Sequence, residues 1–344
     1  MKNVTKIVMF ALCAVLAMDS CTKRHLQHED DTQSMPVDFS AVSQYVSVKA
    51  DDPQPAPLSD YHQDFGVWGI ARQAGNPNPY ILWMTNLEQV TKQGDYYKPA
   101  NSANQAFWLK DYTYHFLAIA PFTGLGANVT ATQATASAQD KLTFTYDLGT
   151  KYEAGNLDFD LMGAAAVTPV TTTKPEHQSL VFWHLFSKIC IKVNFVNATG
   201  TVDEIRLSNV VTKGDYVLSL DEVNDFDKPL SVTCTPSIDA ADKLSSSSAL
   251  VLNSTNKDSG TTQQWTLHVI PQVVSGFDMY IDFTIGASLV ENFKVNLSAA
   301  GTAPYTYNGS YNWNLNITPN GITFDVAIVP WSDDNTGDND FDFE

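Results

Sequence analysis

Asp158 and Asp160 are the residues whose type and spacing come nearest to catalytic machinery. Two carboxylates two positions apart on one strand point to the same face. There one could act as a general acid and the other as a general base, as in glycoside hydrolysis. The same spacing is common on the solvated face of an ordinary strand. We keep hydrolysis as a residual alternative and predict that the chain is not an enzyme.

Other chemistry-bearing patterns give little support to a reaction. The sequence contains no HExxH, GxSxG, paired CxxC, P-loop or GxGxxG motif, so it offers no sign of a metalloprotease, a serine hydrolase or a nucleotide-binding enzyme. Its histidines are dispersed, and we predict neither a metal site nor a cofactor. Cys190 and Cys234 lack metal-ligand spacing; they could form a disulfide in an oxidising compartment or stay unpaired.

Cys21 has the surroundings of a lipidated residue. Two lysines precede an uncharged run at 7–17, which is the pattern of a signal-peptide core and is too short to cross a bilayer. The next residues, Met-Asp-Ser-Cys, resemble a bacterial lipobox, although Asp19 stands where a small residue is usual. We expect residues 1–20 to be a lipoprotein signal peptide and Cys21 to carry palmitate-type acyl chains that anchor the chain at the outer membrane, exposed on the cell surface. An ordinary signal-peptidase site is the alternative.

The overall charge argues against nucleic acid as a partner. The chain has 20 Lys and Arg against 38 Asp and Glu, a formal net charge of −18, which would repel a phosphate backbone. Hydrophobic residues make up 44% and charged residues 17% of the sequence, as in a globular protein. We expect residues 21–35, which are polar, to be a tether and the folded body to begin near residue 36.

Short runs of alternating polar and apolar residues recur along that body, separated by turn residues. In the clearest run, at 188–195, Ile189, Ile191, Val193 and Phe195 point to one face. No apolar stripe with helical period is comparably long, so the sequence predicts an all-β protein made of β-sandwiches. A proline- and threonine-rich segment at 168–178 reads as a linker, which gives an N-terminal sandwich at 36–175 and a C-terminal one at 176–344.

Several segments, taken in order, resemble the fimbrillin family, the pilin-like lipoproteins of the Bacteroides group that build type V fimbriae. The resemblance covers most of residues 65–331 and is carried by FGVWGIA at 65–71, YYKPANSANQAFWLKDYTYHFLAIAPF at 96–122, DLM at 160–162, LVFWHLFSKICIKV at 180–193, IPQ at 270–272, and YNWNLNITPNGITF at 311–324 with Trp331. The resemblance implies two transthyretin-like β-sandwich domains in tandem.

The resemblance also implies assembly by protease-triggered donor-strand exchange. In such pilins, removal of the first strand opens a groove that the C-terminal strand of another subunit fills. Here residues 37–50 stand where the removable strand belongs, with Lys49 and Ala50 as the candidate processing site. The family often has Thr-Arg-Ala where this chain has Val-Lys-Ala, so Arg72 is an alternative site, and Lys49 could equally be a solvated strand end.

At the other end, Phe341 and Phe343 alternate with acidic residues and form a candidate donor strand. An acidic tail that is disordered in the free monomer, or a weak calcium site, are the alternatives.

We predict a stalk, tip or anchor subunit of a surface fimbria that mediates adhesion and binds other fimbrial subunits and a host or bacterial surface ligand. The alternative is a monomeric outer-membrane lipoprotein that binds glycans through exposed Trp and Tyr side chains.

Overall fold

The structure is a computed structural model that describes residues 35–43, 56–73, 80–81, 87–123, 125, 129–132, 140–168, 176–220, 230–259, 263–329 and 331. Strands dominate these residues. The helical elements among them are short: α2 (Gly149–Glu153) and the 3-10 turns η1 (Leu58–Asp60), η2 (Ser102–Asn104), η4 (Ala240–Asp242), η5 (Ser246–Ser248), η6 (Val274–Gly276) and η7 (Leu297–Ala300). None of the helices in the described part of the chain has the length and apolar character needed to span a membrane.

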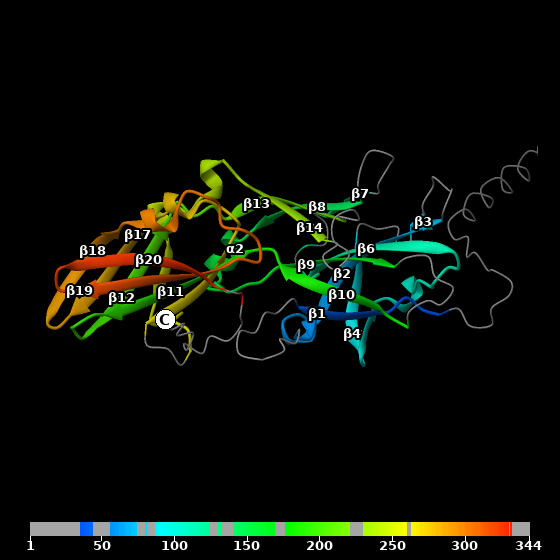
Figure 1. Cartoon of the computed structure of the whole chain (residues 1–344), viewed down its shortest axis with the longest axis horizontal. Helices are drawn as coiled ribbons and strands as arrows, with labels where there is room; N and C mark the ends of the chain where they lie inside the picture. Colours follow the sequence, from blue (N-terminus) through cyan, green and yellow to red (C-terminus); the bar gives the residue numbers. More distant parts are fainter. Residues whose placement is uncertain are drawn as a thin grey trace, which may run out of the picture. The chain divides into compact units, whose positions relative to one another are not determined.

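Seven strands of the first sandwich close on themselves. Figure 1 shows several of them, among them β1, β2, β6 and β10, gathered in one region of the fold. Because β2 pairs with both β4 and β6, the order β2-β4-β5-β1-β10-β9-β6 returns to β2 and leaves no free edge in this sheet, which we call the ring. A two-residue strand, β3 (Tyr80–Ile81), adds to β2. The ring consists of β1 (Phe39–Ser43), β2 (Asp64–Gln73), β4 (Glu88–Gln93), β5 (Tyr96–Pro99), β6 (Tyr112–Ala120), β9 (Met162–Thr168) and β10 (Gln178–His184).

Side chains from every ring strand fill its interior. Alternate residues of each strand point inward, as the two-residue period of a strand requires, and they form a separate buried cluster that includes Phe65, Phe116 and Phe182. The opposite faces of β2 and β6 are also apolar: Trp68 and Leu117 belong to a second, larger cluster outside the ring.

A four-stranded sheet, the cover sheet, packs on that outer face and completes the first sandwich. Its order is β14-β13-β8-β7, from β7 (Thr130–Thr132), β8 (Lys141–Asp147), β13 (Lys213–Leu220) and β14 (Leu230–Pro236). Leu142 and Leu218 from this sheet share the larger cluster with Trp68 and Leu117. Two layers of sheet therefore bury one apolar core between them.

The second sandwich consists of two four-stranded sheets. One has the order β16-β11-β19-β20 and the other β15-β12-β17-β18. The indole nitrogen of Trp265 on β16 donates to the carbonyl of Asn253 on β15 at 2.8 Å, and the rings of Phe195 and Phe283 lie 6.2 Å apart across the sheets. The strands are β11 (Ser187–Phe195), β12 (Gly200–Ser208), β15 (Leu250–Asn253), β16 (Gln264–Val269), β17 (Asp278–Ile285), β18 (Ser288–Val295), β19 (Ser310–Thr318) and β20 (Gly321–Val329).

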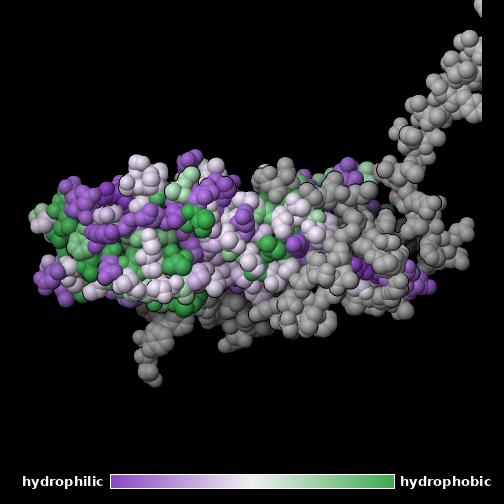
Figure 2. Space-filling model, turned by 90° about the horizontal axis from the view of Figure 1, so that it is seen from above, coloured by the Kyte–Doolittle hydropathy of each residue, from purple (hydrophilic) through white to green (hydrophobic). Residues whose placement is uncertain are grey.

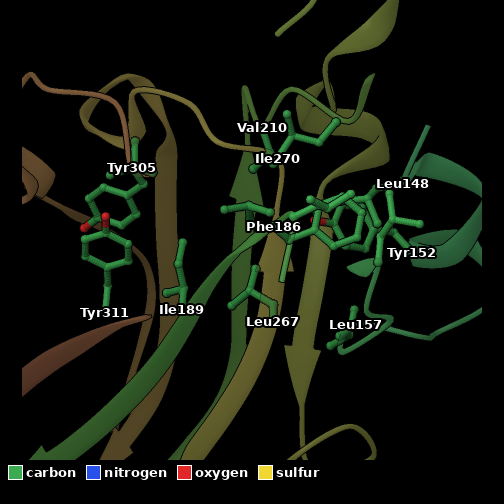
Figure 3. Close-up of a cluster of buried hydrophobic side chains, with 14 of the residues drawn as sticks. Leu148, Tyr152, Leu157, Phe186, Ile189, Val210, Leu267, Ile270, Tyr305 and Tyr311 are labelled. Carbon is green, nitrogen blue, oxygen red and sulfur yellow. The ribbon is translucent and has the colours of Figure 1, made fainter. Parts of the chain in front are cut away.

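One buried cluster runs through the second sandwich and on to the cover sheet. Figure 3 shows part of it: Tyr305 and Tyr311 lie ring against ring at one side, and Leu148 and Tyr152 lie at the other. The two tyrosine rings are stacked with centroids 3.5 Å apart. The all-β fold made of several sheets, expected from the sequence, is confirmed.

The strand pairing crosses the domain boundary that we expected at residue 175. β10 lies after that position, yet it pairs with β1 and β9 in the ring. β13 and β14 lie later still, and β13 pairs with β8 in the cover sheet. The strand pairing places the passage from the ring to the second sandwich at residues 185–186, between β10 and β11. The chain later contributes β13 and β14 to the cover sheet of the first sandwich.

Cys190 and Cys234 are both free thiols. They lie on β11 and β14, and the structure leaves the two thiols unpaired. Burial raises the pKa of each thiol to about 11.

We expect neither thiol to react quickly with a thiolate-specific reagent at pH 8 in the folded protein, because the thiolate is the reactive species. In denaturant without reductant both should react. A colorimetric thiol titration measures this; a denatured chain that shows no reactive Cys190 or Cys234 would mean that the two are paired.

Candidate functional site

Strand β1 lies in the ring between two strands that are remote from it in the sequence, β10 and β5. It runs parallel to β10, with five paired residues from Phe39 opposite Gln178 to Ser43 opposite Phe182. On its other side it meets β5 antiparallel, at Phe39 opposite Tyr97. Neither partner is joined to β1 by a hairpin, so its covalent link to the rest of the body is the segment 44–55.

The inner face of β1 fills the ring. Val37, Phe39 and Ala41 are 0%, 0% and 8% exposed. The ring of Phe39 meets Phe65 and Phe116 edge-to-face, with centroids 5.9 and 5.4 Å apart, an arrangement that aromatic pairs prefer. We call the position of β1 between β5 and β10, over this aromatic floor, the β1 seat.

Asp38, the residue directly before β1, has a buried carboxylate side chain. The side chain of Asp38 is 8% exposed, and its Oδ2 lies 3.3 Å from Nζ of Lys98 on β5. The amide Nε2 of Gln105 lies 3.4 Å from Oδ1 of Asp38 and also donates to the carbonyl of Val37 at 3.1 Å. A buried carboxylate needs such partners, so the β1 seat holds an acid on one face and apolar side chains on the other.

Backbone hydrogen bonds extend the seat at both ends. The amide of Val37 donates to the carbonyl of Ala106 at 2.9 Å, and the amide of Ser43 donates to the carbonyl of Ala56 at 2.8 Å. The amide of Gln178 donates to the carbonyl of Asp38 at 2.7 Å. Loss of β1 would leave these groups unpaired, and unpaired buried backbone groups are costly.

The structure describes only part of the site expected from the sequence. Of the expected strand at 37–50, residues 39–43 form β1, and the candidate processing site Lys49–Ala50 lies outside the described residues. The lipidation site Cys21 and the candidate donor residues Phe341 and Phe343 also lie outside them.

The two aspartates considered for catalysis do not form a pair. Residues 157–161 are not a strand; Asp158 is exposed, whereas Asp160 is largely buried. The described residues also hold no group of three or more His, Cys, Asp or Glu side chains arranged to bind a metal ion.

Arg72, the alternative processing site, is held inside the ring sheet. It pairs with Thr113 in the β2–β6 ladder, and its guanidinium Nη2 lies 2.7 Å from Oδ1 of the buried Asp140. A protease must bind its substrate as an extended, unpaired strand, so we expect trypsin to leave the bond after Arg72 intact while the protein is folded. Limited digestion followed by mass spectrometry measures this, and an early fragment beginning at Gln73 would contradict it.

A buried cluster of histidines is the feature that sequence reasoning missed. Nδ1 of His184, at the end of β10, lies 2.6 Å from Oδ2 of Asp160, and the ring of Trp331 stacks on His184 with centroids 4.0 Å apart. His268 on β16 also packs against Trp331 and its Nδ1 lies 3.0 Å from the carbonyl of Phe159. The cluster joins the end of the ring strand β10 to Trp331, two residues beyond the end of β20. Its members are far apart in the sequence, so no local spacing could have signalled it.

We expect acid to destabilise the protein through this cluster. Burial lowers the pKa of His268 and His62, although the Asp160 carboxylate opposes the shift in both. Below pH 6.5 these histidines are therefore protonated more fully in the unfolded chain than in the folded one. The free energy of unfolding then falls as the pH is lowered, by at most about 1.4 kcal/mol per pH unit for each histidine. Urea unfolding at pH 7.5 and 5.5 measures the fall, which His268→Gln should reduce; equal midpoints at the two pH values would refute the expectation.

Comparison with known proteins finds a matching family model and solved structures with a similar fold. A family model described as fimbrillin-like matches residues 59–331, and no curated protein matches significantly. Among solved structures, a candidate cell adhesion protein from Bacteroides ovatus is similar with a TM-score of 0.54 at 13% identity, over 87% of this chain and 98% of that one. A fimbrial protein from Bacteroides vulgatus is similar with a TM-score of 0.52 at 15% identity, over 86% of this chain and 99% of that one.

Proposed function

This chain belongs to the fimbrillin-like family, and from that premise we propose that it is a fimbrial subunit assembled by strand exchange at the β1 seat. In this proposal, proteolysis within residues 44–55 releases β1, and the C-terminal strand of another subunit takes its place. Lys49–Ala50 is the proposed processing site, since Arg72 is paired within β2. The family is one of fimbrial and cell-adhesion proteins, and we propose a structural, non-enzymatic role in adhesion.

The observation that carries the proposal is the position of β1. It lies between two strands that are remote from it in sequence, and its inner side chains are fully or almost fully buried. Its removal would open a strand-wide gap over an aromatic core, with unpaired backbone groups on both sides. An incoming strand would restore both the hydrogen bonds and the apolar contacts.

The C-terminal residues have the pattern that this gap requires. Phe341 and Phe343 are spaced by two, as are the inward-facing residues of β1, so both would point into the ring from one strand. Each Phe that becomes fully buried contributes about 1.5–3 kcal/mol. We further propose that acyl chains on Cys21 hold the unprocessed subunit at the outer membrane until cleavage.

Glycan binding by surface aromatics is the weaker candidate. Sugar-binding surfaces need exposed aromatic rings, and none of the Trp and Tyr side chains whose burial the structure describes is exposed. The exposed large apolar side chains of this part are aliphatic or methionine, apart from Phe107 at 37% exposure. Figure 2 shows hydrophobic residues reaching the surface among hydrophilic ones.

Controlled cleavage tests the proposal. A recognition sequence for a specific protease is placed within residues 44–55 of the otherwise complete chain, and the products are analysed by electrophoresis without boiling and by light scattering. We expect the cleaved protein to form a ladder of oligomers and the uncleaved protein to stay monomeric.

A matched variant separates strand exchange from general stickiness. Phe341→Ser with Phe343→Ser leaves β1 and its seat untouched, so it should be cleaved normally and should form few oligomers. Oligomers that form equally well without cleavage, or with both phenylalanines replaced, would overturn the proposal, as would a cleaved chain that stays monomeric.

A further inference from the structure

Asp-Phe is one of the dipeptides that recur in this sequence, and one copy lies at the start of β1. That copy is Asp38-Phe39, and two further copies, Asp340-Phe341 and Asp342-Phe343, lie near the C-terminus. In the β1 seat the two halves of this dipeptide have distinct environments. Phe39 lies among the rings inside, whereas Asp38 faces outward and is nevertheless almost completely buried.

The environment of Asp38 is specific for an acid. Lys98 supplies a cation 3.3 Å from one carboxylate oxygen, and Gln105 directs an amide N–H toward the other at 3.4 Å. Gln105 also donates to the carbonyls of Val37 and Ala106 at 3.1 and 3.0 Å, which fixes its orientation. Lys98, Gln105 and the carbonyl of Ala106 belong to the seat and would remain after β1 leaves, whereas the carbonyl of Val37 would leave with β1. The Lys98 side chain is 40% exposed, whereas the carboxylate side chain that it meets is only 8% exposed. A basic residue at this position would therefore bring a second, buried cation close to Lys98, which is unfavourable.

We propose that Lys98 and Gln105 form an acid-binding pocket that sets the register of the incoming strand, with Asp342 in the place of Asp38 and Phe343 in the place of Phe39. This inference rests on the proposed strand exchange and adds to it the feature by which the seat recognises its strand. The incoming strand then runs parallel to β10, as β1 does.

Side-chain volume selects this register over the one that uses Asp340. With Asp342 in the pocket, Phe341 takes the place of Val37, so an apolar residue replaces an apolar one. With Asp340 in the pocket, Asn339 would replace Val37, which is 0% exposed, and Phe343 would replace Ala41, which is 8% exposed. In this Asp340 register, Asn339 would bury an amide without a partner in the place of Val37. Phe343 would overfill the space that the methyl group of Ala41 occupies. Both replacements are unfavourable.

Charge reversal in the complete, cleavable chain tests the pocket. Asp342→Lys should lower the association constant of the oligomers about fivefold, the change that corresponds to about 1 kcal/mol for an ion pair with one half-exposed partner. Asp340→Lys is the matched control, because it makes the same charge change two residues away, and it should leave the constant within twofold. Adding Lys98→Glu to Asp342→Lys should restore most of the loss.

A double-mutant cycle with Lys98→Met covers the case in which the charge-reversed seat folds poorly. In that background Asp342→Lys and Asp340→Lys should have equal effects, because the cation that distinguishes them is gone. Equal effects of the two aspartate changes in the original chain, or no rescue by Lys98→Glu, would overturn the acid pocket. If oligomers still formed only after cleavage in that case, the proposal of strand exchange would stand. A cleaved original chain that forms no oligomers would overturn both.

Discussion

Replacing Phe39 with alanine is expected to lower the free energy of unfolding of the uncleaved protein by about 3–5 kcal/mol. The side chain is 0% exposed and meets Phe65 and Phe116 edge-to-face in the ring. Its removal would leave a cavity in a closed ring whose strands all contribute to one core, so the surroundings cannot collapse readily into the space. Urea unfolding followed by circular dichroism measures the change.

Phe107→Ala is the matched control for this variant. Phe107 is 37% exposed, and its replacement should cost less than about 1 kcal/mol. If the two variants lost similar stability, β1 would not be seated in the core of the solution structure. Phe39→Ala should also speed the loss of β1 after cleavage, because that phenylalanine is the largest side chain that β1 buries.

Replacing Asp140 with alanine is expected to cost a comparable amount, about 3–5 kcal/mol, because it breaks a buried ion pair and leaves a cation without its partner. The side chain of Asp140 is 1% exposed; one oxygen lies 2.7 Å from Arg72 and the other 2.7 Å from Nδ1 of His115. Asp140 directly precedes β8 of the cover sheet, whereas Arg72 and His115 lie on β2 and β6 of the ring. The carboxylate therefore ties the two layers of the first sandwich together.

The exposed pair of Lys294 and Asp278 is the control for Asp140. Its atoms are also 2.7 Å apart, but the lysine side chain is 59% exposed, so Lys294→Ala should leave the unfolding midpoint unchanged. If Asp140→Ala proved as mild as Lys294→Ala, the contact between the ring and the cover sheet would not depend on this carboxylate. If the carboxylate does hold the two layers together, trypsin should reach Arg72 more readily in the Asp140→Ala chain.

Alternation in the sequence predicted strands where one face is apolar and the other polar. The run at 188–195 is β11, with Ile189 and Ile191 buried as expected. The alternation of polar and apolar residues gave no signal for β9, because its sequence MGAAAVT is rich in small residues that are rare in strands. The reason is packing: an added Cβ on Gly163 would lie 2.7 Å from the side chain of Leu218, so β9 needs small residues where the cover sheet approaches the ring.

Pairing between remote segments could not be predicted from local patterns. Nothing in the sequence of β10 indicates that it joins β1 in parallel, or that β13 returns to β8. Strand pairs therefore cross the expected boundary at 175, because a Pro- and Thr-rich segment marks a break in the strand pattern of the sequence and not a break in strand pairing. The resemblance to fimbrillins did direct attention to the first strand, but the buried Asp38 and its partners Lys98 and Gln105 emerged only from the structure.

A structure of the cleaved, oligomeric protein is the most direct test of the exchangeable first strand. The account predicts a strand between β5 and β10 that is continuous with the residues following Trp331 of a neighbouring subunit, with a phenylalanine over Phe65 and Phe116. Oligomers in which β1 still occupies its own seat, or in which β5 has closed directly onto β10, would contradict it.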